Sequence, residues 1–399
     1  MMPLPASADQ CAALARRRLL TLLGWAGRTH FWAARLGGAG IGRPLRERDV
    51  FAALAELPPV SARELRLAGT GAVRDGWIRP WWASSLSSGS TAEPFRMYFD
   101  PRAWSLLRYR VKLRARGACG VSPHDRIAVL DAIPPAAEGR SAMERLGVFR
   151  RISVMQPVER MAEKLAAHRP AAVYGPPSAL LAAGRALSGT GRMLSVRAVF
   201  ASGEPLHAST RAEVAAAYGA PVLDVYGSAE TKEIAWECLA GGRHVNADVL
   251  HVEIVRPDGR VASTGEEGEI LVSVLVNRAM PLLRYATGDR GVLQPGQCAC
   301  GSPLPLLELV SGREADAREL DGRRVAANGL TAAMERVEGL VRYRASRRVG
   351  RHPRMRATPA RQPDPARADH GVRAVDRLAD GPAPLSGSAP TSSSDRSDA

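Results

Sequence analysis

The sequence lacks any long apolar run. No stretch of about 18 uninterrupted apolar residues, roughly the length that crosses a bilayer, occurs in the chain, so no membrane-spanning helix is expected. The first apolar stretch, residues 19–23, follows three arginines but precedes no convincing small-residue cleavage site, which argues against a secretory signal peptide. We therefore expect a cytoplasmic protein, and 45% hydrophobic residues are ample for a buried core.

Lysine is scarce, with only Lys112, Lys164 and Lys232 in a chain whose net charge is +15. Nearly all of the positive charge is arginine, which is typical of a GC-rich coding sequence. The arginines after residue 341 are not interleaved with aromatic side chains and form no helical stripe. We therefore expect no nucleic-acid partner. Salt-dependent retention on DNA would be the test of that alternative.

Cysteine is also rare, but two short segments of the sequence contain residues that could bind a metal. Cys298 and Cys300 form a Cys-x-Cys pair, and Cys238 and His244 precede them. Three thiolates and an imidazole suit tetrahedral Zn²⁺, and a full set of protein ligands would make the zinc structural. The spacing is tighter than the usual Cys-x₂-Cys, so free thiols are the alternative. A disulfide is not expected in the cytoplasm.

The middle of the chain alternates between helical and β-rich patterns. The helical patterns cover residues 102–117, 157–168, 177–187 and 207–218. The β-rich runs between them are residues 127–130, 171–174, 196–200 and 221–226. This alternation predicts an α/β fold with βα units around a largely parallel sheet. Residues 250–310 instead contain strand patterns separated by Asp-Gly and Glu-Gly turns, which predicts an antiparallel part.

A hydroxyl-rich segment precedes this α/β part. It consists of Ser87, Ser88, Gly89, Ser90 and Thr91. Glycine lets the backbone approach a ligand, and the hydroxyl and N–H groups can donate to phosphate oxygens. An ordinary Ser/Gly surface turn is the alternative. The strand-like run at 95–99 that follows favours a phosphate loop, because a flexible linker is unexpected there.

Further glycine-containing loops follow three of the β-rich runs. They are Tyr174-Gly175, Gly203-Glu204-Pro205 and the segment from Tyr226-Gly227 to Glu230. Ligands bind at the carboxyl ends of strands in an open α/β sheet, so three such loops indicate one crevice. Each loop alone is a weak signal, since glycine after a strand is usually a turn. Asp289 in a Gly-flanked turn and Arg313 after Ser-Gly complete the ordered set.

In this order the motifs resemble those of the adenylate-forming superfamily of acyl-CoA ligases and related synthetases. The similarity is greatest to the branch of phenylacetate–coenzyme A ligases, deazaflavin-coenzyme adenylating synthetases and capsule-biosynthesis homologues. It runs from about residue 15 to 340 and includes residues 57–65 and 242–248. The resemblance implies a large adenylate-forming N-terminal domain with βα units and an antiparallel β subdomain. The small C-terminal domain of the superfamily would be truncated or lost here.

The resemblance also implies a role for each motif. The implied ATP-binding residues are Ser87, Ser88, Gly89, Ser90, Thr91, Gly203, Glu204, Pro205, Tyr226, Gly227, Asp289 and Arg313. The hydroxyl loop would hold the β- and γ-phosphates, Tyr226 would lie against adenine, and Asp289 would accept hydrogen bonds from the ribose hydroxyls. Without the resemblance, a half-buried core tyrosine and a turn aspartate are equally good interpretations of Tyr226 and Asp289.

Two implied catalytic residues act at the phosphates. Thr91 belongs to the phosphate loop, and Glu230 would bind Mg²⁺ or water near the α-phosphate. Mg²⁺ would carry more of the charge neutralisation because Glu93 stands where many members have lysine. The alternative for Glu230 is a carboxylate at a helix N-terminus. Tyr174 and Gly175 would line the acyl pocket.

The implied reaction is attack of an organic carboxylate on ATP, giving acyl-AMP and pyrophosphate, followed by transfer to a thiol such as CoA. Members of the superfamily use a lysine from the small C-terminal domain for the first step, and no lysine follows Lys232 here. We predict that the chain binds ATP or AMP but adenylates slowly. The alternative function is a catalytically degenerate nucleotide-binding or assembly protein. Homodimerisation stays open.

The predicted organisation has three parts. Residues 1–311 form the adenylate-forming core, 312–341 the hinge and a remnant of the small domain, and 342–399 a tail rich in Arg, Pro and Ser. The tail has few large apolar residues and no sustained periodicity, which predicts disorder. A frameshift or a truncated gene explains the abrupt change better than a divergent tail.

Overall fold

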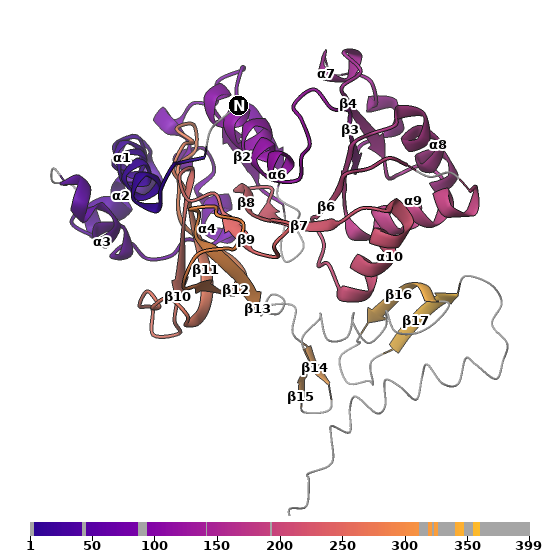
Figure 1. The fold of residues 1–399 in the computed structure, drawn as a ribbon. Coiled ribbons are helices and arrows are strands. Elements are labelled where there is room, and N and C mark those ends of the chain that lie inside the picture. Colours follow the sequence, from indigo (N-terminus) through magenta and orange to yellow (C-terminus); the bar gives the residue numbers. More distant parts are fainter. Residues whose placement is uncertain are drawn as a thin grey trace, which may run out of the picture. The chain divides into compact units, whose positions relative to one another are not determined.

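The computed structural model describes residues 4–41, 45–86, 94–140, 142–191 and 194–310, together with the backbone of four short strands beyond residue 317. The chain divides into two compact units, residues 1–316 and 317–399 (Figure 1). Within the described residues, no helix is both long enough and apolar enough to cross a membrane.

The first unit is built on one eleven-stranded sheet of order β10-β11-β12-β13-β9-β8-β7-β6-β5-β3-β4. Its parallel half consists of β3 (Ile127–Asp131), β4 (Phe149–Ser153), β5 (Ala172–Gly175), β6 (Ala198–Ser202) and β7 (Val222–Ser228). The helices between these strands are α7 (Ala142–Arg145), α8 (Val158–His168), α9 (Pro177–Gly189) and α10 (Ala208–Tyr218). The predicted α/β fold with βα units is confirmed.

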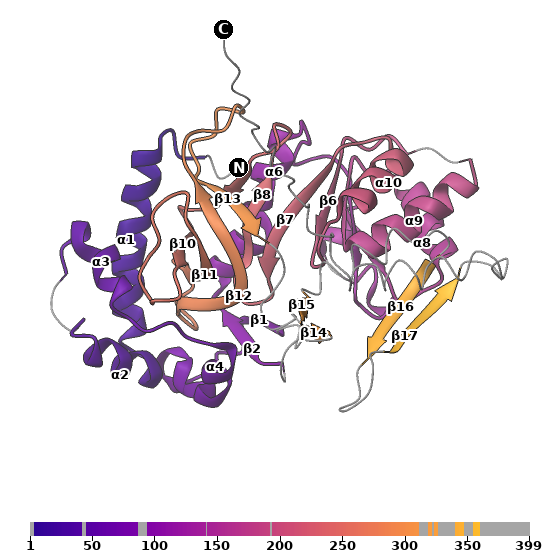
Figure 2. The ribbon, with the colours of Figure 1, turned by 90° about the horizontal axis from the view of Figure 1, so that it is seen from below.

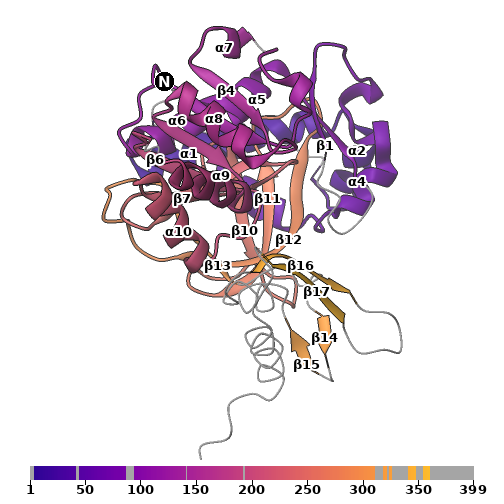
Figure 3. The ribbon, with the colours of Figure 1, turned by 90° about the vertical axis from the view of Figure 1, so that its right-hand side faces the viewer.

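Helices cover both faces of the parallel half. α8, α9 and α10 pack side by side against alternate residues such as Val173 and Val199 (Figure 3). The residues between them, including Tyr174 and Phe200, face α6 (Lys112–Ala118) instead. Side chains of a strand alternate between the two faces of its sheet, which explains why these strands read as continuous apolar runs.

The other half of the sheet is antiparallel. It contains β8 (Lys232–Glu237), β9 (Arg243–Val245), β10 (Leu250–Val255), β11 (Glu267–Val274), β12 (Leu282–Gln294) and β13 (Leu306–Val310). The expected antiparallel part is thus present, but it continues the same sheet, because β8 pairs antiparallel with β7.

The N-terminal helices lie beside the antiparallel half (Figure 2). They are α1 (Ala8–Ala26), α2 (His30–Gly38), α3 (Val50–Ala55) and α4 (Ala62–Ala68). Trp32 of α2 is fully buried and donates its indole N–H to the Pro281 carbonyl oxygen at 2.8 Å. α3 and α4 are separate helices, since Pro58-Pro59 lies between them and proline cannot continue a helix.

A hairpin and a second helical segment complete the first unit. β1 (Ala83–Leu86) pairs antiparallel with β2 (Arg96–Phe99). The predicted helix over 102–117 is α5 (Pro101–Ser105) followed by a π-helical turn and α6. Asp100 accepts hydrogen bonds from the first N–H groups of α5, and Pro101 occupies its first position, so the sequence fixes this helix start.

Two hairpins are described in the second unit. β14 (Arg318–Leu320) pairs with β15 (Arg323–Val325), and β16 (Leu340–Ser346) pairs with β17 (Arg354–Pro359). Part of the second hairpin falls in the span for which we predicted disorder, whereas residues 360–399 lie outside the described residues. The division at 311 and 341 stays a prediction.

Candidate active site

Tyr226 and Asp289 meet at the junction of the two halves of the sheet. Tyr226 lies on β7 and Asp289 on β12, and the Tyr226 hydroxyl donates to Asp289 Oδ2 at 2.9 Å. Both residues are half-buried, so each can present a polar edge to a ligand. The sheet therefore brings together two groups of the predicted nucleotide site that are 63 positions apart.

Glu230 lies in the turn between β7 and β8. Its carboxylate is buried and accepts a hydrogen bond from the Tyr285 hydroxyl at 3.2 Å. The turn is closed by Ser228 Oγ, which accepts from the N–H groups of Glu230 and Thr231, both at 3.2 Å. A strand and not a helix follows Glu230, so the alternative of a carboxylate at a helix N-terminus is wrong.

Gly227 precedes this turn and is required by close packing. A Cβ at Gly227 would lie 2.1 Å from the Lys232 carbonyl oxygen on β8. The register of the two strands also shifts between Tyr226 and Gly227. A β-bulge of this kind redirects neighbouring side chains, which suits a position beside a ligand.

Gly203, Glu204 and Pro205 follow β6 and are exposed. Gly203 has φ +90°, which favours glycine. The Glu204 carboxylate accepts hydrogen bonds from the Ser178 N–H at 3.0 Å and the Ser178 hydroxyl at 2.9 Å. Ser178 lies in the first turn of α9, so Glu204 ties the loop after β6 to the loop after β5.

Tyr174 and Gly175 end β5. The Tyr174 ring is buried and stacks on Phe200, with ring centroids 4.5 Å apart. Arg116 Nε donates to the Tyr174 hydroxyl at 3.0 Å, and Lys112 Nζ lies 5.0 Å from the ring centroid. The predicted acyl-pocket tyrosine is therefore surrounded by cationic groups.

Burial raises the pKa of the Tyr174 hydroxyl and lowers the pKa of Lys112 to about 8. We did not predict Lys112 or Arg116 as site residues from the sequence, although they are four residues apart and so share one face of α6. It also missed Glu233 on β8, which is 5% exposed. A carboxylate in an apolar strand was the signal that could have found it.

Six predicted residues lie outside the described part of the chain. They are Ser87, Ser88, Gly89, Ser90, Thr91 and Arg313. The two strands that flank the hydroxyl loop, β1 and β2, pair with each other, with Leu86 opposite Arg96. The strand-like run expected at 95–99 is thus β2.

The four predicted metal ligands come together. The ligand atoms of Cys238, His244, Cys298 and Cys300 all lie within 4.8 Å of one another. Cys238 Sγ and Cys298 Sγ are 3.6 Å apart, and Cys300 Sγ is 3.2 Å from His244 Nε2. Zn–S bonds of about 2.3 Å at tetrahedral angles place two sulfurs about 3.8 Å apart, so the donor set fits zinc.

Gly242 makes this cluster possible. A Cβ at Gly242 would lie 2.6 Å from Cys298 Sγ, so any larger residue would displace that thiol. Gly242 also contacts a second member of the cluster, since its carbonyl oxygen accepts a hydrogen bond from the Cys238 N–H at 2.9 Å.

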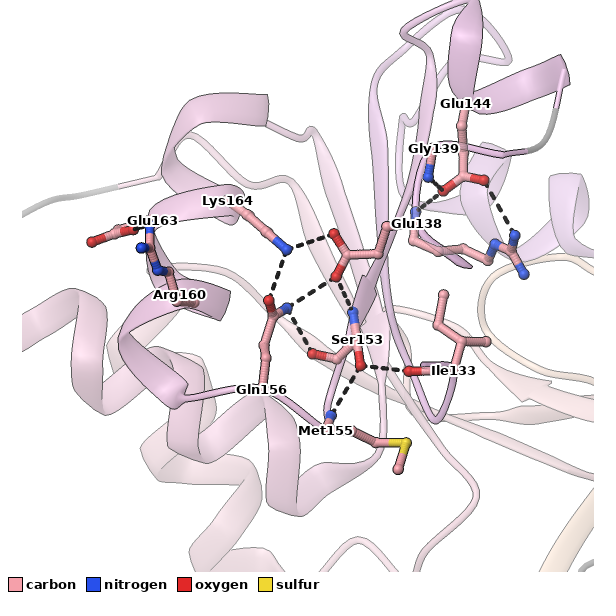
Figure 4. Close-up of polar contacts among 11 residues, drawn as sticks. Ile133, Glu138, Gly139, Glu144, Ser153, Met155, Gln156, Arg160, Glu163 and Lys164 are labelled. Atoms are coloured by element: carbon pink, nitrogen blue, oxygen red, sulfur yellow. Dashed lines mark hydrogen bonds and ion pairs between the residues drawn. The ribbon is translucent and has the colours of Figure 1, made fainter. Parts of the chain in front are cut away.

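A separate polar network fixes the loop after β3 at the sheet edge (Figure 4). Lys164 Nζ donates to Glu138 Oε2 at 2.6 Å and to Gln156 Oε1 at 2.7 Å. Glu138 Oε1 also accepts from the Ser153 N–H at 2.8 Å. These groups satisfy one another, so we assign this network a structural role.

Comparison with known proteins finds similarities that agree with one another. Residues 143–274 match the AMP-binding enzyme family. A phenylacetate-coenzyme A ligase of Escherichia coli (strain K12) is 29% identical over 269 residues, which are 64% of this chain and 60% of that protein. A phenylacetate-coenzyme A ligase of Thermus thermophilus is 30% identical over 146 residues, 35% of this chain and 33% of that protein. The chain thus spans less than two thirds of the length of these relatives.

Solved structures give the fold. A 2-hydroxyisobutyryl-CoA ligase in the postadenylation state superposes with a TM-score of 0.70 and 18% identity, covering 91% of this chain and 80% of that chain. This likeness shows that the chain shares the fold of that ligase, and residues 143–274 in addition match the AMP-binding enzyme family. In sequence, the chain is similar to the phenylacetate-coenzyme A ligases.

Proposed function

We propose that the chain activates an organic carboxylic acid with ATP to an acyl-adenylate and transfers the acyl group to a thiol such as CoA. The observation that carries the proposal is the Tyr226–Asp289 hydrogen bond, which pairs an aromatic ring with a carboxylate beside the buried Glu230 turn. Residues 143–274, which include Tyr226 and Glu230, match the AMP-binding enzyme family, and this match supports AMP or ATP as the ligand.

The residues suit the chemistry of the first step. The Tyr226 ring offers a stacking surface for adenine, and a single carboxylate such as Asp289 can accept hydrogen bonds from both ribose hydroxyls. The substrate carboxylate attacks the α-phosphorus and the bond to pyrophosphate breaks, so negative charge spreads over phosphate oxygens. Positioning and charge stabilisation supply most of the catalysis in such a step. Glu230 would hold Mg²⁺, which neutralises the phosphate charge.

We infer that this step is slow in the 399-residue chain, because no lysine follows Lys232. An arginine carries the same charge but has a different shape and hydrogen-bonding geometry. The same observation favours the second candidate, a nucleotide-binding or assembly protein that has the fold without efficient catalysis.

The test measures binding and chemistry separately. We expect ATP or AMP to bind in calorimetric titration, and Asp289→Ala to weaken binding at least about tenfold through loss of a charge-assisted hydrogen bond. Carboxylate-dependent exchange of labelled pyrophosphate into ATP should be slow. Rapid exchange would contradict the slow step, whereas wild-type protein without nucleotide affinity would contradict both candidates.

We further propose that Cys238, His244, Cys298 and Cys300 hold a structural zinc ion in a cytoplasmic protein. The fit of the donor set and the contact between Gly242 and Cys298 support this proposal. Purified protein should contain about one zinc per chain by elemental analysis, and a chelator should lower its melting temperature. Cys11→Ser, far from the cluster in sequence, is the control thiol variant.

The sequence leaves homodimerisation open. Light scattering of the purified protein would measure its molecular mass in solution and so test whether it forms a homodimer.

A further inference from the structure

Near Tyr174, the residue predicted to line the acyl pocket, lies a buried carboxylate that the proposed function does not use. Glu233 is 5% exposed and lies on β8 opposite Gly227 of β7. Among the described residues, neither of its carboxylate oxygens has a hydrogen-bond partner. Burying a carboxylate without a partner destabilises a protein by several kcal/mol, so such a group is rarely kept without a use.

The cations near Glu233 are oriented toward other groups. Glu233 is within electrostatic range of Lys112, Arg114 and Arg116. Arg116 Nε donates to the Tyr174 hydroxyl, and Lys112 Nζ lies over the Tyr174 ring. Arg114 is held by Asp248, with N–O distances of 2.7 and 2.8 Å.

The described residues around Glu233 therefore supply positive potential but no donor in contact. Burial raises the pKa of Glu233 despite the nearby cations, which is consistent with a carboxyl group that lacks donors. An N–H or O–H group of a ligand that entered beside Tyr174 would satisfy its oxygens. A purely apolar ligand would leave them unsatisfied.

We propose that Glu233, with Tyr174, Lys112 and Arg116, selects an acid substrate that carries a hydroxyl or amino donor in addition to its carboxylate. The inference rests on the proposed function, since it names the substrate class of the same site. Sites built to hydrogen-bond a donor discriminate strongly against the analogue that lacks it, because the buried acceptor is then left unpaired.

The test compares phenylacetate with 2-, 3- and 4-hydroxyphenylacetate and 4-aminophenylacetate, which differ from it only by the added donor. Each acid is titrated into the full chain by calorimetry, with and without AMP. We expect at least one donor-bearing acid to bind about tenfold or more tightly than phenylacetate. Glu233→Leu should reduce this preference to within about twofold. Glu233→Gln should keep part of it, because its amide oxygen still accepts.

Glu237→Gln is the matched control, since Glu237 lies on the same strand and is paired with Arg211 at 2.8 Å. It should leave the preference unchanged. Equal binding of all five acids to the wild type would overturn the inference, and so would a failure of every acid to bind. An unchanged preference in folded Glu233→Leu and Glu233→Gln would also overturn it. AMP binding in the same titrations reports the nucleotide site separately, so its loss would count against the proposed function alone.

Discussion

Gly175 is a residue for which the fold leaves room only for hydrogen. A Cβ at this position would lie 2.8 Å from Leu130 Cβ, because β3 and β5 are neighbouring strands and Leu130 sits beside the end of β5. Sequence analysis placed Gly175 in a ligand-binding loop, and the structure adds a packing reason for the same glycine.

Gly175→Ala should therefore lower the free energy of unfolding by roughly 1–3 kcal/mol, the usual effect of overpacking. Gly24→Ala in α1 is the matched control, since nothing lies within 4 Å of its added Cβ. There, alanine loses less backbone conformational entropy on folding than glycine does, which should stabilise the protein by up to about 1 kcal/mol. Urea unfolding of both variants measures the difference, and equal effects would contradict the packing argument.

His251 gives the chain an acid-sensitive position. Its ring stacks on Phe51, with centroids 4.3 Å apart, and burial, together with Arg284, lowers the pKa of His251 from 6.5 to about 4. The unfolded state then binds more protons than the folded state between pH 6.5 and 4. The stability contributed by neutral His251 is therefore complete above pH 6.5 and is lost as the pH falls through this window.

His251→Leu should remove this dependence. The wild type should lose up to about 3 kcal/mol more of its free energy of unfolding than His251→Leu between pH 7 and pH 4. Denaturant unfolding of both proteins at several pH values measures the loss. Parallel pH profiles would show that His251 does not titrate as expected.

At the scale of elements, local signals fix where helices begin. Ser61 caps α4 by accepting from the Glu64 N–H, and the Glu64 carboxylate accepts from the Ser61 N–H at 2.9 Å. Arg35 of α2 also donates to Glu64 at 3.0 Å. The Ser-x-x-Glu pattern is visible in the sequence, but the contact with α2 is not.

Ser61→Ala should lower the free energy of unfolding by about 1 kcal/mol, because it leaves the Glu64 N–H without its cap. Ser188→Ala near the C-terminus of α9 is a control serine substitution that removes no cap and should have a smaller effect. Thermal unfolding compares the two, and a larger loss for Ser188→Ala would contradict the capping argument.

At the scale of the whole molecule, one buried ion pair joins distant segments. Arg114 of α6 and Asp248, which precedes β10, are each 1% exposed at their side chains. Arg18 of α1 also contacts Asp248, at 3.3 Å. Three segments from different parts of the chain thus converge on a single carboxylate.

Arg114→Leu should lower the free energy of unfolding by about 3–5 kcal/mol, because it removes the main partner of a buried charge. The double variant Arg114→Leu/Asp248→Leu should be less destabilised than Arg114→Leu alone, since no charge is then left unpaired. Guanidinium unfolding of both variants is the measurement. A double variant that is less stable than Arg114→Leu would contradict this expectation, because it would show that an unpaired Asp248 does not account for the loss of stability.

The sequence by itself determined the α/β class, the βα units and the antiparallel part, because apolar periodicity and turn residues act over short distances. The order of its motifs also indicated a resemblance to the adenylate-forming superfamily, and the comparisons find the same similarity. The tertiary structure decided which groups meet. Pairing of β7 with β8 joins both halves into one sheet. This brings Tyr226 to Asp289 and buries Glu233 with no donor from the part of the chain that the structure describes. Contacts between residues so far apart in sequence depend on strand order and burial, which no local pattern encodes.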